Sequence, residues 1–108
     1  MHALRFKIQL AAALCLANVG LTATAQNASE LNARSLAATC ANCHGTDGRS
    51  IEGAAVPSLA GMPKTYMLAQ MKAFKSGTRP ATVMHQISKG YSDAQIESLA
   101  AYFAAVKP

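Results

Sequence analysis

The chain has 108 residues and a formal net charge of +5, and its basic residues are scattered without a dense run or a basic helix face. This distribution argues against a nucleic-acid-binding protein, because such proteins gather Lys and Arg into a patch or a stripe. The length allows one small domain, and a domain of this size buries little core and commonly needs a covalent or metal staple.

Residues 1–25 have the pattern of a secretory signal peptide. Arg5 and Lys7 precede an apolar stretch over residues 8–17, and the segment ends in Ala23-Thr24-Ala25. The apolar stretch is shorter than the roughly 20 residues that a membrane-spanning helix needs. We therefore predict a signal peptide over 1–25 and an exported, periplasmic domain over 26–108 without a stable membrane span, with an uncleaved anchor as the alternative. Removing Arg5 and Lys7 lowers the formal charge from +5 to +3.

The first expected helix after the signal peptide covers about residues 29–40. Ser29 is its predicted N-cap, and Glu30 is an acidic residue in its first turn. The candidates for its buried side are Leu31, Leu36 and Ala38. This helix delivers the most informative motif of the chain at its end.

The motif Cys40-Ala41-Asn42-Cys43-His44 has the Cys-x-x-Cys-His pattern of haem c attachment. Two thiols at this spacing add to the two vinyl groups of one porphyrin, and the next imidazole is left beneath the iron. His44 is expected to bind iron through Nε2 while its other nitrogen donates a hydrogen bond. A thioredoxin-like dithiol and half of a zinc site are the alternatives, although no βαβ pattern and no second Cys or His pair flank the motif. We predict one covalently attached haem c.

A turn and a loop are expected to follow the motif. Residues 45–49 contain two glycines and Asp47, which are typical of turns. Residues 50–61 show no sustained periodicity, so we expect a loop wrapped over the haem edge. The carbonyl of Pro57, or one close to it, is the candidate acceptor for the Nδ1 proton of His44. An ordinary loop proline is the alternative interpretation.

The second expected helix covers residues 63–75, with Pro63 in its first turn and Gly77 just after its end. Met67, Met71 and Phe74 fall on one face, and we interpret the methionines as core residues. Two residues in or after this helix are candidate partners for the haem propionates, namely Tyr66 and Arg79.

A short helix or turn over 81–89 is expected to present Met84 and His85. The last helix is the best marked, because Ser92 as N-cap and Gln95 at N3 make a capping box. Its apolar stripe, expected to pack against the first helix and the haem edge, consists of Ile96, Leu99, Ala100, Phe103 and Val106. No strand alternation or internal repeat is visible. We predict an all-α domain of three main helices plus a short one.

The residue at the second axial position of the haem decides the function. A haem bound by His44 alone has an open face that suits ligand binding or peroxide chemistry, whereas a second protein ligand makes an electron carrier. The candidate methionines after the signal peptide are Met62, Met67, Met71 and Met84. Met84 is favoured because it lies well downstream of His44 and just before the last helix. His85 is the rival, but adjacent side chains on a helix point about 100° apart, so only one of the pair can face the iron.

The motif, residues 56–61, residues 73–79, Met84 and residues 99–103 together carry a family resemblance. On these stretches the chain resembles the small bacterial class I c-type cytochromes over nearly all of residues 26–108. The resemblance implies a helical fold that wraps the haem, Met84 as the distal ligand, and a proline carbonyl, here that of Pro57, bonded to His44. Within the family, residues 82–92 look most like the cytochrome subunit of flavocytochrome c sulfide dehydrogenase, in which a separate flavoprotein oxidises sulfide.

We therefore expect a periplasmic monohaem cytochrome c that transfers single electrons and is not itself an enzyme. Cys40 and Cys43 are expected to hold the haem covalently, and His44 and Met84 to bind its iron. One role implied by the resemblance is the haem subunit of a sulfide dehydrogenase with a flavoprotein partner. The other is a free soluble carrier to a terminal oxidase or reductase. A gas-binding or enzymatic haem protein and a dithiol oxidoreductase are rivals from other classes.

Overall fold

The structure, a computed structural model, describes residues 27–108, and residues 33–108 form one compact unit. The predicted signal peptide and its cleavage site lie outside the described residues. Among residues 27–108, no helix has the length and the apolar character that crossing a bilayer requires.

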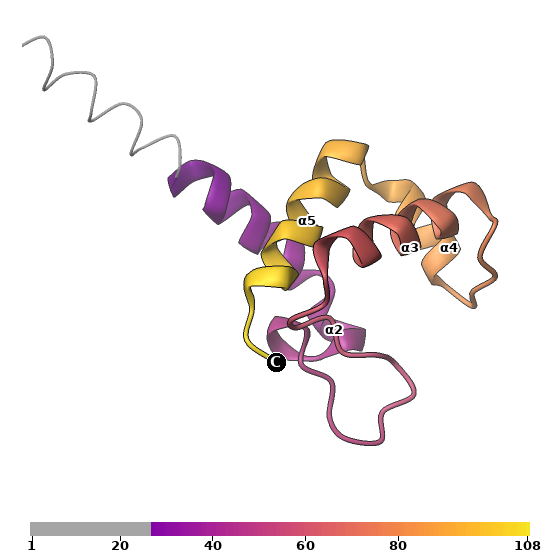
Figure 1. Cartoon of the computed structure of the whole chain (residues 1–108), viewed down its shortest axis with the longest axis horizontal. Helices are drawn as coiled ribbons and strands as arrows, with labels where there is room; N and C mark the ends of the chain where they lie inside the picture. The colour runs from indigo at the N-terminus through magenta and orange to yellow at the C-terminus, as the bar shows by residue number, and fades with distance from the viewer. Residues whose placement is uncertain (1–26) are drawn as a thin grey trace, which may run out of the picture. The chain divides into compact units, whose positions relative to one another are not determined.

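The described residues are helical and contain no strand, as Figure 1 shows. The first part consists of a helix over residues 27–38, α2 (Ala41–His44) and the 3-10 helix η1 (Thr46–Gly48). After a long irregular segment, the second part consists of α3 (Lys64–Ser76), α4 (Met84–Ile87), the 3-10 helix η2 (Ser88–Gly90) and α5 (Asp93–Ala105). The predicted all-α fold is confirmed.

The first helix ends earlier than predicted. It stops at residue 38, because the hydroxyl and the amide of Thr39 both bond to the carbonyl oxygen of Leu36, at 2.7 and 3.2 Å. Such a side-chain bond to the backbone competes with helical hydrogen bonding. The attachment motif then forms its own short helix, α2, which the sequence did not predict. The buried side was also predicted wrongly at Ala38 and Leu31, which are exposed, whereas Ala37, one position away, is buried.

The other boundaries differ from the predictions by a few residues. Pro63 is the N-cap of α3 and not part of its first turn, and Gly77 ends that helix in the left-handed conformation with φ of 80°. The helix predicted over 81–89 begins only at Met84 and tightens into η2 at Ser88. The capping box of α5 is confirmed, because the hydroxyl of Ser92 accepts from the amide of Gln95 at 3.2 Å while the Gln95 side chain accepts in return at 2.8 Å.

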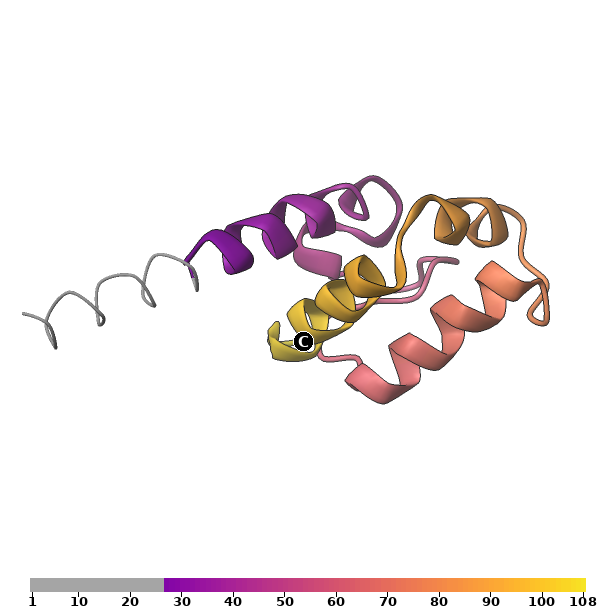
Figure 2. The same ribbon diagram turned by 90° about the horizontal axis from the view of Figure 1, so that it is seen from above.

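Helix α5 forms the centre of the core. Ile96, Leu99, Ala100 and Phe103 are each at most 1% exposed, which confirms four members of the predicted stripe. The fifth, Val106, follows the end of the helix in an extended conformation and is half-buried. The four buried residues of the stripe pack in one cluster with Ala37 and with residues of α3, which lies beside α5 in Figure 2.

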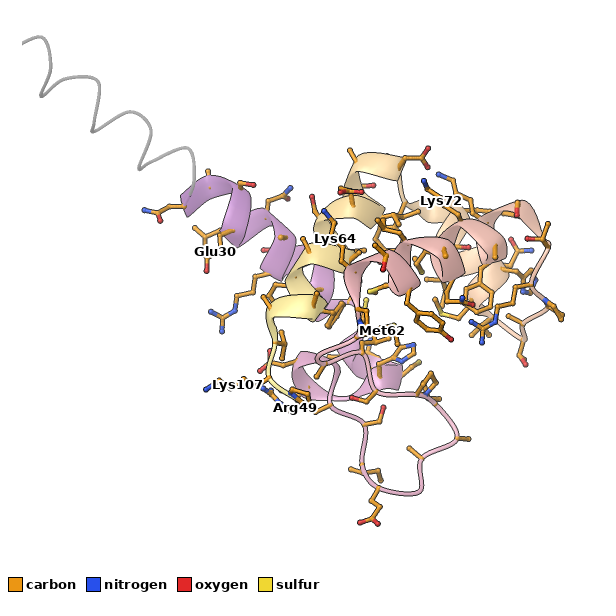
Figure 3. All side chains as sticks on the ribbon, in the orientation of Figure 1. Glu30, Arg49, Met62, Lys64, Lys72 and Lys107 are labelled. Atoms are coloured by element: carbon orange, nitrogen blue, oxygen red, sulfur yellow. The ribbon has the colours of Figure 1, made fainter. Side chains whose placement is uncertain are left out.

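Two contacts attach the segment after the motif to the end of the chain. The side chain of Arg49 donates from Nε to the carbonyl oxygen of Lys107 at 3.0 Å, and the two residues lie side by side in Figure 3. The amide of Gly61 donates to the carbonyl oxygen of Phe103 at 2.9 Å. The irregular segment between Arg49 and Gly61 is therefore anchored at both ends to α5 and the residues that follow it.

Candidate functional site

A cavity of about 440 Å³ lies between the attachment motif, the loop that follows it, α3 and α4. Its wall includes Cys40, Cys43 and His44 from the motif and Met84 from α4. Most of the other side chains that line it are apolar. The volume falls in the range of about 300–1,000 Å³ that is usual for small-molecule and cofactor sites. The four residues that the sequence singled out are therefore brought together around one cavity.

The imidazole of His44 is held in one tautomer. His44 is buried, and its Nδ1 lies 2.7 Å from the carbonyl oxygen of Pro57, which is the predicted partner. A carbonyl oxygen only accepts hydrogen bonds, so Nδ1 carries a proton, and in the neutral imidazole Nε2 is then the nitrogen with the free lone pair. An unprotonated ring nitrogen whose partner nitrogen is hydrogen-bonded is the state in which histidine binds a metal.

The carbonyl oxygen of Gly48 fixes the loop that carries Pro57. It accepts hydrogen bonds from the Ser58 hydroxyl at 2.8 Å and from the amides of Leu59 and Ala60 at 2.7 and 3.1 Å. These donors come directly after Pro57 in the chain. The contact between Pro57 and His44 therefore depends on a short piece of backbone that η1 holds in place.

The two cysteines of the motif are free thiols, and Cys40 is half-buried while Cys43 is exposed. Burial raises the pKa of the Cys40 thiol, and the neighbouring Thr39 side chain offsets only part of that effect. A thiol with a raised pKa carries little thiolate at neutral pH, whereas a dithiol oxidoreductase needs a thiolate nucleophile. The surroundings of Cys40 therefore disfavour the dithiol interpretation. Within residues 27–108, no three His, Cys, Asp or Glu side chains converge as a metal-binding group.

The structure separates the two rivals for the second axial position. Met84 lines the cavity and His85 does not. The Nδ1 atom of His85 is buried without a hydrogen-bond partner. Met67 and Met71 are 4% and 6% exposed and belong to the core cluster, as predicted, although both also border the cavity. Met62, labelled in Figure 3, lines the cavity from the segment just ahead of α3.

Arg79 is the only Lys, Arg, Asp or Glu among the described residues that line the cavity. Its guanidinium donates to the side-chain oxygen of Gln70 and lies 4.6 Å from the centre of the Phe74 ring. Both contacts orient the guanidinium group. Tyr66, the other predicted propionate partner, also lines the cavity and is 51% exposed. Gln70 was not predicted, because a glutamine on a helix carries no signal of its own.

Two further residues of the cavity wall were missed from the sequence, Thr39 and Tyr91. Their hydroxyl oxygens lie 2.7 Å apart, although the residues are 52 positions apart in the chain. The ammonium of Lys75 donates to the carbonyl oxygen of Tyr91 at 2.8 Å. No local sequence pattern predicts such a pair, because in the sequence each partner looks like an ordinary polar residue near the end of a helix.

Comparison with known proteins agrees with these findings, since a family model described as Cytochrome c matches residues 30–107. The chain belongs to the cytochrome c family. This family binds covalently attached haem c. The residues around the cavity fit that group, because two thiols lie in its wall, the Nδ1 of an imidazole is bound to a carbonyl so that Nε2 is the nitrogen left for a metal, and the lining is mainly apolar.

Three relatives show how far the similarity extends. The chain is 41% identical to the cytochrome subunit of sulfide dehydrogenase from Chlorobaculum tepidum, over 63% of this chain and 60% of that protein. It is 38% identical to the thiosulfate dehydrogenase electron acceptor of Thiomonas intermedia, over 88% of this chain and 44% of that protein. The solved structure of Acidithiobacillus ferrooxidans cytochrome c4 matches 62% of this chain and 38% of its own with a TM-score of 0.58 and 39% identity. The chain spans about half the length of these relatives.

Proposed function

We propose that this protein is an electron-transfer cytochrome c that holds one haem c in the cavity. The observation that supports this proposal is the meeting of Cys40, Cys43, His44 and Met84 in the wall of one mainly apolar cavity. Cys40 and Cys43 would form the thioether bonds, and Nε2 of His44 and the sulfur of Met84 would bind the iron. When bound, the haem supplies one-electron chemistry between Fe(III) and Fe(II).

The residues of the chain determine how that chemistry is used. The carbonyl of Pro57 holds the His44 ring in one orientation and raises the basicity of Nε2. A thioether ligand from Met84 raises the reduction potential relative to a second histidine. With a side chain at both axial positions, no position is left open for a substrate. We therefore propose a carrier and not an enzyme.

We also propose that Arg79 and Tyr66 bind the carboxylates of the haem. A carboxylate at an apolar site needs charged or hydroxyl donors. Arg79 supplies a guanidinium that Gln70 and Phe74 already orient, and Tyr66 supplies an exposed phenol on α3. Both side chains border the cavity, so each is placed to meet a carboxylate of a haem bound there.

We further propose that the domain over residues 26–108 works in the periplasm after removal of the signal peptide over 1–25. Vicinal thiols in an oxidising compartment tend to form a disulfide unless they are otherwise engaged. Thioether bonds to haem engage both Cys40 and Cys43. Export and covalent attachment are therefore compatible.

Replacing Met84 by Ala tests the proposed iron ligation. The oxidised holoprotein of Met84→Ala should lose the sulfur-to-iron charge-transfer band, and the reduced form should bind carbon monoxide rapidly. Met62→Ala is the matched control, because Met62 also lines the cavity and is not a proposed ligand. A band that survives in Met84→Ala would remove Met84 from the site. Rapid carbon monoxide binding by the unaltered protein would favour a gas-binding haem protein.

Two electron-transfer roles differ in their partner. The subunit role is favoured by the 41% identity to the cytochrome subunit of sulfide dehydrogenase. The free-carrier role is favoured by the similarity to a thiosulfate dehydrogenase electron acceptor and to cytochromes c4. Purification from the native host under mild conditions separates the roles. A stable partner that contains flavin supports the subunit role, and elution as a flavin-free haem protein supports the carrier role.

A further inference from the structure

A single hydrogen bond joins two parts of the polypeptide that border the cavity. Residues 33–62, here called the attachment part, contain the Cys-x-x-Cys-His motif, and residues 63–91, here called the methionine arm, contain Met84. Among the described residues, the only hydrogen bond between the two parts is the one between Thr39 Oγ1 and the Tyr91 hydroxyl, 2.7 Å apart. Apart from the backbone bonds inside the first helix, the other hydrogen bonds of the attachment part stay within it or reach α5 and the residues that follow it.

The direction of this bond follows from the number of protons available. Thr39 Oγ1 also lies 2.7 Å from the carbonyl oxygen of Leu36, which only accepts, so the single hydroxyl proton of Thr39 is used there. The Tyr91 hydroxyl is therefore the donor to Thr39 Oγ1. The substitution Tyr91→Phe keeps the ring, which lines the cavity and packs against the core, and removes only the donor.

Tyr91 is well placed to connect the two parts. It follows η2 directly, and it is held through its own carbonyl oxygen by the ammonium of Lys75 at 2.8 Å. Thr39 directly precedes Cys40. The side chain of Tyr91 therefore fastens the residue beside the first attachment cysteine to the end of the α4–η2 segment, which begins at Met84.

We propose that the hydrogen bond between Tyr91 and Thr39 is a latch that holds Met84 at the cavity, which makes Tyr91 a positioning residue for the second axial ligand. This inference rests on the proposed ligation by Met84. A segment with few buried contacts opens without global unfolding. Helix α4 is a single turn, and Val83 and Ile87 on either side of Met84 are 52% and 42% exposed. Loss of one net hydrogen bond should therefore shift the α4–η2 segment about threefold to tenfold toward its open state.

The experiment compares Tyr91→Phe with Tyr102→Phe in the oxidised holoprotein. Tyr102 is the matched control, because its hydroxyl donates to Asp47 at 3.3 Å and so joins the attachment part to α5 and not to the methionine arm. The probe is imidazole, which binds the iron once Met84 has left it. The apparent affinity for imidazole should rise about threefold to tenfold in Tyr91→Phe and by less than about twofold in Tyr102→Phe.

A second readout does not depend on the iron. Hydrogen exchange of the α4 and η2 amides under native conditions should accelerate in Tyr91→Phe and not in Tyr102→Phe. Thr39→Val removes the acceptor and should raise the affinity for imidazole as Tyr91→Phe does. The double variant should exceed neither single variant, because both substitutions remove the same bond.

The outcomes separate failure of the latch from failure of the ligation. Unchanged affinity for imidazole and unchanged exchange in Tyr91→Phe, or equal changes in Tyr102→Phe, overturn the latch. A double variant whose effect is the sum of the two single effects overturns it as well. If Met84 is not the ligand, the sulfur-to-iron band is absent from the unaltered protein or survives in Met84→Ala, and both results are obtained before Tyr91→Phe is compared.

Discussion

Gly48 lies between the core and the candidate site. Its carbonyl oxygen binds the loop of the site, and its lack of a side chain lets a core residue pack against it. The carbonyl accepts the donors of residues 58–60 that fix the Pro57 loop. The backbone has φ of +74°, and a Cβ at this position would lie 2.7 Å from a ring carbon of Phe103. Phe103 is fully buried, so its ring cannot move away without disturbing its neighbours. A side chain at position 48 would therefore displace both the core and the loop that orients His44.

Gly48→Ala should lower the free energy of unfolding of the holoprotein by about 2–5 kcal/mol, which combines left-handed strain with overpacking. Gly77→Ala is the matched control, because Gly77 has φ of +80° and no atom lies within 4 Å of an added Cβ. The free energy of unfolding of this control should fall by only about 1–2 kcal/mol, which is the cost of the left-handed strain alone. Denaturant unfolding of both variants measures the difference. Equal losses would show that the contact with Phe103 is not the cause.

At the level of the helices, the start of α5 is the point where local and distant contacts meet. Ser92 and Gln95 form the capping box, and Asp93 stands in the first turn, where a negative charge interacts favourably with the helix dipole. The ammonium of Lys75, from the end of α3, lies 2.9 Å from the Asp93 carboxylate. The hydrogen bond and the charge of Lys75 lower the pKa of the Asp93 carboxyl. One lysine thus joins α3 to α5 and also holds Tyr91.

The lowered pKa of Asp93 predicts a specific pH dependence of stability. A carboxyl whose pKa is lower in the folded than in the unfolded protein stabilises the fold above the unfolded value of about 3.9, and this contribution is lost as the pH falls through the folded value. The stability of the unaltered protein should therefore exceed that of Asp93→Asn at neutral pH, and the difference should narrow at acid pH. Lys75→Met should reduce the same pH dependence. Denaturant unfolding across this range is the measurement, and a difference that stays constant with pH would contradict the role given to Lys75.

The elements differ in how far the sequence predicts them, and the reason is the range of the contacts involved. The capping box of α5 and the glycine that ends α3 depend on neighbours within four residues, so their spacing is visible in the sequence. The end of the first helix at residue 38 depends on the Thr39 hydroxyl, and the choice of Ala37 over Ala38 for the core depends on packing against a helix about 60 residues away. The spacing of the attachment motif predicts three site residues from the sequence alone, whereas nothing in the local sequence predicts the bond between Thr39 and Tyr91.

Across the molecule as a whole, the cavity is continuous with the core. Met67 and Met71 of α3 and Leu99 of α5 are buried members of the core cluster and also line the cavity. A small domain buries a low fraction of its surface, so its core has little stability in reserve. A haem in the cavity would therefore complete the core as well as provide the redox centre, and attachment through two cysteines would make it a permanent part of the fold.

The double variant Cys40→Ala/Cys43→Ala, purified without haem, tests this dependence. Without haem, the apolar side chains that line the cavity face water and lack packing partners. A small domain has a total stability of only about 5–15 kcal/mol to offset that loss. The variant should therefore show a weak helical signal by circular dichroism and no cooperative thermal transition. Each single variant keeps one thioether bond to haem and should unfold cooperatively at an intermediate temperature. A colourless double variant with full helix content and a sharp transition would show that the polypeptide does not need the haem to complete its core.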